Sequence, residues 1–203
     1  SNAVTLPAVT DDGMLEGLIT VGDITKSYMN VYDSKILSKA NTQYSNIIET
    51  VEGDLIVGDA DAYFSEGKVL IAAANPDLME YYINKNDLVI LGNRYESQQC
   101  AIEMEAACII VCEGAGVSMT IKKLAQERGC TVIATTYDTY TVARLVNQSM
   151  PISYFMKTDN LVTFDENDII DEIKDVMASK RYRDFPILDK NGRYKGMISR
   201  RNL

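Results

Sequence analysis

Residues 6–24 read LPAVTDDGMLEGLITVGDI, and residues 185–203 read FPILDKNGRYKGMISRRNL. The first stretch lies over the second without a gap when Leu6 is placed on Phe185, and apolar positions match apolar positions. Four positions are identical: Pro7/Pro186, Gly13/Gly192, Gly17/Gly196 and Ile19/Ile198. Agreement of the proline and both glycines in register indicates an internal repeat, so both ends of the chain should share one fold.

Each copy predicts a β-hairpin followed by the start of a helix. A proline begins a short apolar strand, where its missing N–H costs least. Asp12-Gly13 and Asn191-Gly192 favour type I′ turns, because these residue types accept positive φ. The second strand is expected to end at Thr20 in one copy and at Ser199 in the other.

The second copy also carries elements ahead of its hairpin. Residues 161–164 predict a short strand, and Asp165 is a candidate N-cap with Asp168 in the first turn. A helical apolar stripe follows, made of Ile169, Ile170, Ile173, Val176 and Met177. The predicted unit is therefore strand, helix, strand, turn, strand, helix.

Strand and helix patterns alternate between the two copies. Residues 29–51 predict one helix. Strands are then expected at 55–57, 69–73, 88–91, 109–111 and 131–135, and helices near 76–84, 96–107, 117–128 and 139–148. Such alternation predicts a mostly parallel α/β layer structure.

Residues 112–118 join a predicted strand to a predicted helix and contain Gly114 and Gly116. A phosphate-binding loop is one interpretation, because helix N-termini bind anions. The segment lacks the lysine of a P-loop and the third glycine of a dinucleotide fingerprint, and Glu113 would repel phosphate. A plain strand-to-helix turn is therefore favoured.

The composition bounds the class of protein. The 203 residues are 46% apolar and 24% charged, as in a globular protein of one or two domains. The sequence contains no apolar run long enough to predict a membrane span. The chain has no histidine, which excludes histidine-based catalysis and histidine metal ligands within it. Its four cysteines predict buried thiols in a reducing cytoplasm, and residues 1–3 are expected to be an expression scar.

The charge is unevenly distributed. Residues 180–201 carry eight basic and two acidic groups and are therefore strongly cationic, whereas the rest of the chain is strongly acidic. An acidic chain with one basic segment is a poor general nucleic-acid binder and a better binder of a discrete anion such as a nucleotide phosphate. A solvated basic surface is the alternative.

The repeat resembles the CBS domain in residues 185–189, 196–199 and 17–24. That resemblance implies a first copy over residues 4–28, incomplete at its N-terminus, and a second over residues 151–203. CBS domains pair as a Bateman module and commonly bind adenine nucleotides. No nucleic-acid or membrane partner is expected.

The middle of the chain resembles the DRTGG domain in residues 56–59, 91–94 and 133–139. The name-giving motif is altered, because Asn93-Arg94 stands for Asp-Arg and residues 112–114 for the Thr-Gly-Gly part. The expected fold is mixed α/β: a CBS-domain pair (Bateman module) with an inserted linker helix and DRTGG-type parallel α/β domain over residues 29–150.

The order CBS, DRTGG, CBS resembles the regulatory region of CBS-containing family II inorganic pyrophosphatases, as found in clostridia. The resemblance implies a cytoplasmic, homodimeric regulator of an attached manganese- or magnesium-dependent enzyme. AMP and ADP would inhibit, and ATP or diadenosine polyphosphates such as diadenosine tetraphosphate would activate. The chain itself should be non-catalytic and hold no cofactor or metal, because the family's catalytic region requires histidines.

The resemblance also implies a site between the copies. Under this resemblance the purine would pack against Val162, Tyr182, Phe185 and Pro186. The phosphates would bind Lys180, Arg183 and Arg200. Asp23 and its counterpart Asn202 would meet the ribose, and Ser199 a ribose or phosphate oxygen. The full expected set is Val4, Thr5, Pro7, Thr20, Asp23, Thr158, Val162, Lys180, Tyr182, Arg183, Asp184, Phe185, Pro186, Ser199, Arg200 and Asn202.

Two other functions stay open at this stage. The chain could be a nucleotide-independent dimerisation or structural module. An enzyme built on the central α/β layer is disfavoured, because no convincing catalytic constellation accompanies the absence of histidine.

Overall fold

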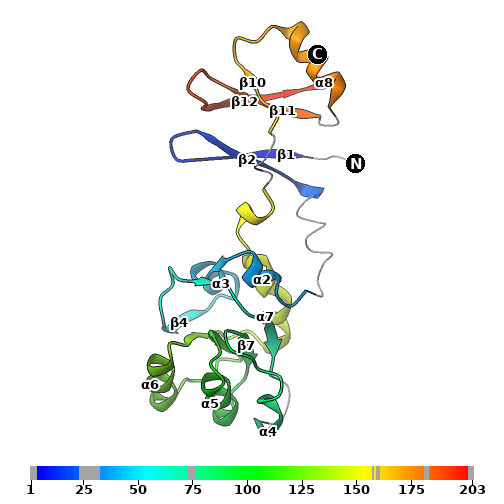
Figure 1. The fold of residues 1–203 in the computed structure, drawn as a ribbon. Helices are drawn as coiled ribbons and strands as arrows, with labels where there is room; N and C mark the ends of the chain where they lie inside the picture. The colour runs from blue at the N-terminus through cyan, green and yellow to red at the C-terminus, as the bar shows by residue number, and fades with distance from the viewer. Residues whose placement is uncertain are drawn as a thin grey trace. The chain divides into compact units, whose positions relative to one another are not determined.

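The computed structural model describes residues 4–22, 33–72, 76–156, 158, 161–180 and 183–200. The chain divides into two compact units (Figure 1). Residues 1–30 and 155–203 form one, called here the CBS unit, and residues 31–154 form the other, called the α/β unit. The α/β unit is thus inserted between the two copies of the repeat.

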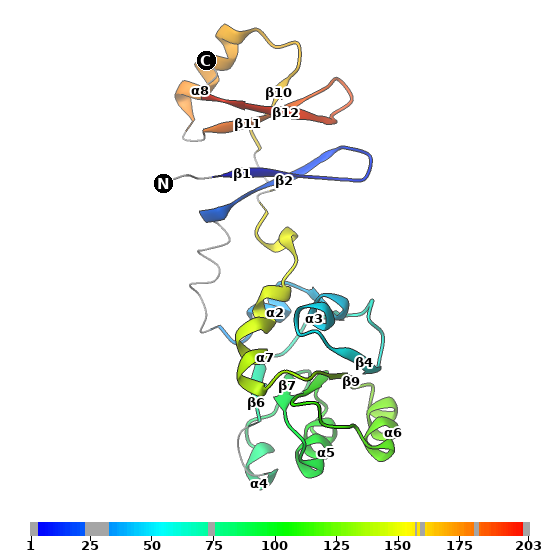
Figure 2. The same ribbon diagram turned by 180° about the vertical axis from the view of Figure 1, so that it is seen from behind.

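The second copy forms a three-stranded sheet covered by a helix. Its strands are β10 (Phe164–Asp165), β11 (Asp184–Leu188) and β12 (Tyr194–Ser199), in the order β10-β11-β12. β10 pairs parallel to β11, and β11 pairs antiparallel to β12 (Figure 2). Helix α8 (Ile170–Ser179) contributes Ile173 and Met177 to a small buried core. The rings of Phe164 and Phe185 meet there, with centroids 5.4 Å apart.

The first copy forms the hairpin β1 (Thr5–Val9) and β2 (Leu15–Thr20) with the same register as β11 and β12. The pairs Thr5↔Thr20 and Leu6↔Ile19 correspond to Asp184↔Ser199 and Phe185↔Ile198, in the same alignment that places Leu6 on Phe185. The register shift near the turn also falls at the same place in both hairpins. The repeat predicted from sequence therefore extends to individual strand pairings.

The turns differ from the predicted type I′. Only the glycine of each turn has positive φ, 83° at Gly13 and 81° at Gly192, so the preceding residue does not take the left-handed conformation that type I′ requires. The Gly13 N–H donates to the carbonyl of Thr10, and Thr10 N–H donates to the carbonyl of Met14. This is the three-residue loop in which a tight turn is followed by a glycine bulge.

The two hairpins meet through an antiparallel bridge between Met14 and Arg193, which occupy equivalent positions in the repeat. Beside it, the Tyr194 N–H donates to the carbonyl of Gly13 at 2.7 Å. Gly192 has φ 81°, which favours glycine, and the flexible methyl end of Met14 lies 2.8 Å from where its Cβ would be. The bridge relates the copies by an approximate two-fold axis.

The α/β unit is built on a five-stranded sheet with the order β4-β9-β8-β7-β6. Its strands are β4 (Asp54–Val57), β6 (Val69–Ile71), β7 (Leu88–Leu91), β8 (Cys108–Val111) and β9 (Thr131–Ala134). β6 to β9 run parallel and β4 runs antiparallel to β9, which confirms the mostly parallel layer. All residues of β7 and β8 are buried, as expected of central parallel strands.

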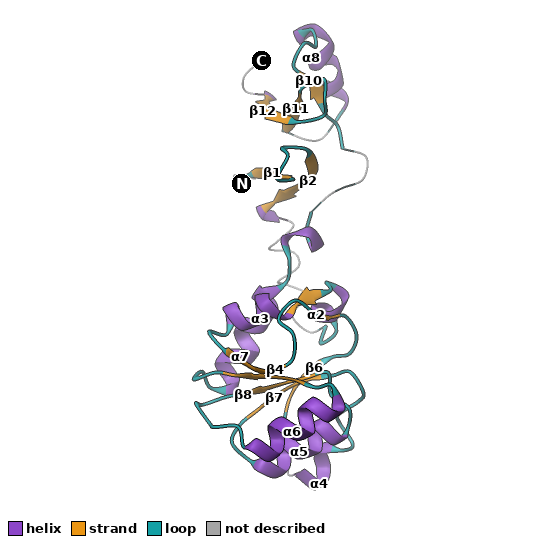
Figure 3. Cartoon of the chain, turned by 90° about the vertical axis from the view of Figure 1, so that its left-hand side faces the viewer, coloured by secondary structure: helices purple, strands orange, loops and turns teal. Residues whose placement is uncertain are grey.

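Helices cover both faces of this sheet (Figure 3). One face carries α4 (Pro76–Met79), α5 (Tyr95–Glu103) and α6 (Met119–Arg128), and the other α2 (Ile36–Lys39), α3 (Tyr44–Thr50) and α7 (Thr139–Leu145). The short strands β3 (Thr42–Gln43) and β5 (Tyr63–Phe64) pair separately. The 3₁₀ turns η1 (Val146–Ser149) and η2 (Ile152–Tyr154) end the unit, and η1 contacts α2.

Several sequence-based boundaries are wrong. The single helix expected over 29–51 is interrupted, because Asn41 has φ 52° and residues 42–43 pair with β5; residues 29–32 lie outside the described residues. Asp165 does not cap a helix: it ends β10, and Ile169 is the N-cap of α8. The strand expected over 161–164 begins only at Phe164, and α4 and α5 end earlier than the periodicity suggested.

Three of the four thiols and the glycine-containing segment follow the favoured interpretations, whereas Cys100 is only half-buried. Cys108, Cys112 and Cys130 are buried free thiols, and burial raises the pKa of Cys112 and of Cys130 to about 12. After β8 the chain turns through Glu113 and Gly114, both at positive φ, and the Ser118 hydroxyl accepts from the Ile121 N–H to cap α6. Residues 112–118 thus form a strand-to-helix turn.

A buried carboxylate organises one edge of the α/β unit. Asp87 is 2% exposed. Its Oδ2 accepts from the Lys68 ammonium at 2.5 Å and from the Asn84 N–H at 2.7 Å, and its Oδ1 accepts from the Lys68 N–H at 3.0 Å. Three bonds from two chain segments therefore converge on one side chain.

Asp87→Ala should lower the free energy of unfolding of the α/β unit by about 3 kcal/mol, because the buried pair is broken and two N–H groups lose their acceptor. Chemical denaturation measures the change. Asp61→Ala, at an exposed carboxylate of the same unit, is the control and should change stability by less than about 0.5 kcal/mol. Equal losses in the two variants would contradict this role of Asp87.

Candidate functional site

Seven of the expected site residues lie at the open ends of the two hairpins, opposite the turns: Val4, Thr5, Thr20, Arg183, Asp184, Ser199 and Arg200. In the second hairpin Asp184 pairs with Ser199, and the Arg200 N–H donates to the carbonyl of Arg183 at 3.0 Å. In the first hairpin Thr5 pairs with Thr20 in the equivalent place. There the Val21 N–H donates to the carbonyl of Val4 at 3.4 Å.

The two open ends share a backbone but differ in chemistry. Arg183 and Arg200 occupy the positions that Val4 and Val21 occupy in the first copy. Both valines are 50% exposed. The first end is therefore apolar and hydroxyl-bearing, whereas the second is charged, with Lys180 nearby at the end of α8. An anionic group would meet its cations in the second copy.

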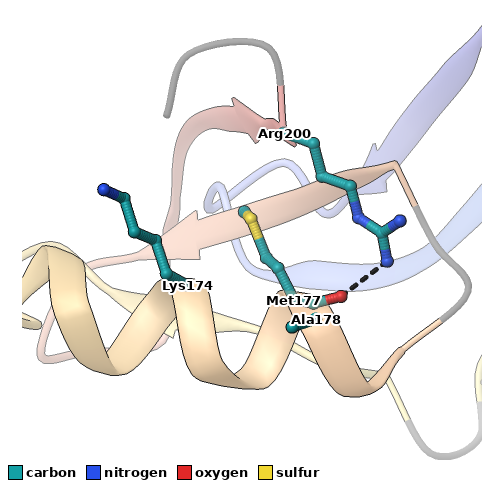
Figure 4. Close-up of a pocket in the computed structure, with 4 residues that line it drawn as sticks. All are labelled: Lys174, Met177, Ala178 and Arg200. Atoms are coloured by element: carbon teal, nitrogen blue, oxygen red, sulfur yellow. Dashed lines mark hydrogen bonds between the residues drawn. The ribbon is translucent and has the colours of Figure 1, made fainter.

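Arg200 has a structural partner. Its Nη2 donates to the Met177 carbonyl at 2.5 Å and also to the Lys180 carbonyl, so the guanidinium caps the C-terminus of α8 (Figure 4). A cation at this end of a helix also complements the helix dipole. Arg183 and Lys180 are exposed and are the better candidates for direct phosphate contact. Sequence reasoning could not separate the two arginines, because the carbonyls that bind Arg200 come from another element.

A pocket of about 410 Å³ lies beside Arg200, lined by Lys174, Met177, Ala178 and Arg200 (Figure 4). Lys174 was not among the expected site residues. Its position one helical turn before Ala178 on the exposed side of α8 is the signal that could have found it. The pocket combines two cations with an apolar floor.

Other expected residues fall into three groups. The Phe185 ring is 1% exposed and packs in the core with Phe164, so it does not present a stacking surface. Pro186 is also buried, and Val162 packs against the same core as Phe185. Pro7 is half-buried opposite Leu18, and Thr158 is exposed. Asp23, Tyr182 and Asn202 lie outside the described residues.

Comparison with protein families identifies the class. The DRTGG domain model matches residues 46–149, and the CBS domain model matches residues 152–203. The chain belongs to the family of proteins that join CBS and DRTGG domains. In the described part of the chain, no helix has the length and apolar character needed to cross a membrane.

Two of the individual relatives are inorganic pyrophosphatases. The cobalt-dependent inorganic pyrophosphatase of Clostridium perfringens is 33% identical over 202 residues, which is all of this chain and 37% of that protein. A probable manganese-dependent inorganic pyrophosphatase of Thermotoga maritima is 24% identical over 198 residues, 98% of this chain and 36% of that protein. The chain therefore spans a little over a third of the length of these relatives.

A solved structure matches nearly the whole chain. It is the CBS and DRTGG domains of the regulatory region of Clostridium perfringens pyrophosphatase, complexed with the activator diadenosine tetraphosphate. The match has 34% identity and a TM-score of 0.89, and it covers 97% of this chain and 85% of that one. The fold expected from sequence, a CBS pair with an inserted DRTGG domain, is confirmed.

Arg200→Ala should lower the free energy of unfolding of the CBS unit by about 1 kcal/mol, because the terminal carbonyls of α8 lose a charged donor. Arg183→Ala is the matched control, since the bond of Arg183 to Arg200 uses a main-chain carbonyl that alanine keeps. Thermal unfolding followed by circular dichroism measures both. Comparable destabilisation by the two substitutions would show that the cap contributes nothing specific.

Proposed function

We propose that this chain is an adenine-nucleotide-binding regulatory region of a cytoplasmic inorganic pyrophosphatase. The observation that carries the proposal is the match over 97% of the chain to a regulatory region solved with diadenosine tetraphosphate. The paired hairpins support it independently, because they offer two ends of the same geometry, one of them cationic. The attached catalytic part would hold the manganese or magnesium, and this chain would hold none.

The expected site residues have distinct roles in the proposed site. Arg183 and Lys180 neutralise phosphate through charge-assisted hydrogen bonds. The hydroxyls of Thr20 and Ser199, at equivalent strand ends, are suited to ribose or phosphate oxygens. Asp23 accepts from ribose hydroxyls, and Tyr182 takes over the stacking role that the buried Phe185 ring cannot fill.

A dinucleoside polyphosphate fits two equivalent ends better than a mononucleotide does. One adenosine would lie in each copy, with the phosphates reaching the cations of the second. Once one adenosine is bound, capture of the other is intramolecular, at an effective concentration of roughly millimolar when the span matches.

Regulation then follows from differential binding. A short ligand such as AMP or ADP favours one arrangement of the CBS pair in a homodimer and inhibits, whereas ATP or a bridging ligand favours another and activates. Each ligand shifts the equilibrium only by the difference in its affinity for the two arrangements.

A nucleotide-independent dimerisation module is the second candidate. The observation that favours it is the burial of the Phe185 ring, which removes one expected ligand group from solvent, together with the use of the exposed Arg200 guanidinium as a helix cap.

Calorimetry separates these candidates. Diadenosine tetraphosphate should bind at least about tenfold more tightly than AMP, with one ligand per CBS pair. Arg183→Ala should weaken nucleotide binding by about 1.5–3 kcal/mol, the size of a charged hydrogen bond, and added salt should weaken binding to the unaltered chain. A stoichiometry of two ligands per CBS pair would contradict the bridging mode but not nucleotide binding itself. Absence of binding by every nucleotide would favour the structural module.

The chain alone should not hydrolyse pyrophosphate with manganese or magnesium, because it has no histidine to provide the metal chemistry of the family. Phosphate release is measured across purification fractions. Turnover that tracks with the chain would contradict the assignment of catalysis to the remainder of the longer protein.

A further inference from the structure

The two halves of the altered DRTGG motif lie side by side in the α/β unit. Residues 93–94 follow β7, and residues 112–114 follow β8. These strands are parallel neighbours in which Leu91 pairs with Val111, and the Cys112 N–H donates to the carbonyl of Leu91 at 2.9 Å. Both halves therefore meet at the carboxyl edge of the sheet, the edge at which open parallel sheets present their ligand-binding loops.

The first turn of α5 offers main-chain donors at this edge. Its N-cap is Arg94, whose side chain makes no capping hydrogen bond. Among the described residues, none accepts from the N–H groups of Tyr95, Glu96 and Ser97. Helix α6, which follows β8, is by contrast capped by the hydroxyl of Ser118. The free N–H groups of α5 and its dipole favour an anion at this point.

Ser97 adds a buried hydroxyl directed at the same place. The residue is 4% exposed and belongs to the buried face of α5. Within the described part of the chain its hydroxyl has no partner, although every fully enclosed polar side-chain atom there has one. The hydroxyl is therefore reachable by solvent although the residue is buried. Helical side chains lean toward the N-terminus of their helix, so this hydroxyl is directed at the loop that precedes α5.

Two glycines leave the main chain of this edge open. Gly92 follows β7 and Gly116 precedes α6, and neither has a heavy atom within 4 Å of the position that a Cβ would take. Neither has the positive φ that favours glycine. Packing and backbone conformation therefore leave both glycines unexplained, whereas close approach of a ligand to the main chain accounts for them.

Arg94 supplies the charge for an oxyanion. Its side chain is exposed, and it forms no ion pair with any described residue. A guanidinium binds a phosphate group through two parallel hydrogen bonds. Two exposed carboxylates, Glu96 and Glu113, lie on the same loops and repel an anion, so binding should be modest and should weaken with salt.

We propose that the carboxyl edge of the α/β sheet is a binding site for a free phosphate group, supplied by inorganic phosphate or by pyrophosphate. The first turn of α5, the Ser97 hydroxyl and the Arg94 guanidinium donate to its oxygens, and Gly92 allows it to approach the main chain. The proposal goes beyond the nucleotide function and does not depend on it, because every residue of this site belongs to the α/β unit.

Titration of the full chain with inorganic phosphate, followed by the resonances of its amides, tests the proposal. The amides of residues 95–97 should shift saturably. Pyrophosphate is the second probe, and the ion that binds more tightly is the source of the group. Arg94→Ala should weaken binding at least about tenfold. Arg128→Ala makes the same charge change at the far end of α6 and should leave binding unchanged, and so should Arg183→Ala in the nucleotide site.

Two further variants separate ligand contact from a structural role. Gly92→Ala fills the open space beside the main chain, and Ser97→Ala removes the hydroxyl that has no partner in the described chain. Each should weaken phosphate binding about tenfold and leave the midpoint of thermal unfolding unchanged, because the fold uses neither feature. Ser118→Ala is the control for a structural hydroxyl: it should lower that midpoint, because it removes the cap of α6.

Glu113→Gln provides a test in the opposite direction. Removal of a repelling charge should tighten phosphate binding at least about twofold, which a purely structural role of these loops would not produce. Three results would overturn the proposal. They are shifts confined to residues 180–200, equal binding by the Gly92→Ala variant and the unaltered chain, and a Ser97→Ala variant that loses stability but not binding.

Discussion

A main-chain bridge between Met14 and Arg193 is the interaction on which the CBS unit depends. A two-stranded hairpin such as β1–β2 is marginally stable by itself in water. The bridge and the adjacent bond from Tyr194 to Gly13 join that hairpin to a sheet that has its own helix and core. This junction fixes how the turn ends of the two hairpins meet.

The sequence predicted the repeat and a hairpin in each copy, because a proline and two glycines mark positions where backbone geometry leaves few alternatives. The structure adds that the same alignment holds for individual strand pairings. The α/β layer was predicted for a similar reason, since fully apolar runs such as residues 88–91 suit central parallel strands. Local patterns failed where a distant segment competes. The helix expected over 29–51 is interrupted by strand pairing with residues 63–64, which no local periodicity reveals.

The candidate site was predicted less completely than the fold. Residue type suggested that Phe185 would stack on a purine and that Arg200 would bind phosphate, but tertiary packing buries the first and uses the second to cap α8. Lys174 was not predicted as a site residue, because it lies on the exposed face of α8 and the sequence analysis used only the apolar stripe of that helix. The count of charged residues identified the basic segment, but only the hairpin geometry shows that its described cations lie at opposite ends of the second hairpin.

The insertion of the α/β unit has a consequence for how the chain folds. Met14 and Arg193 lie near opposite ends of the sequence, and closing so long a loop in an unfolded chain is entropically costly and slow. The α/β unit begins with α2 and ends with η1 and η2, and α2 and η1 are in contact. Once that unit has folded, the two hairpins are tethered to neighbouring points, and the effective loop becomes short. The first hairpin is made early during synthesis, and its partner hairpin follows the central unit along the chain, so the CBS pair cannot assemble before the central unit has been synthesised.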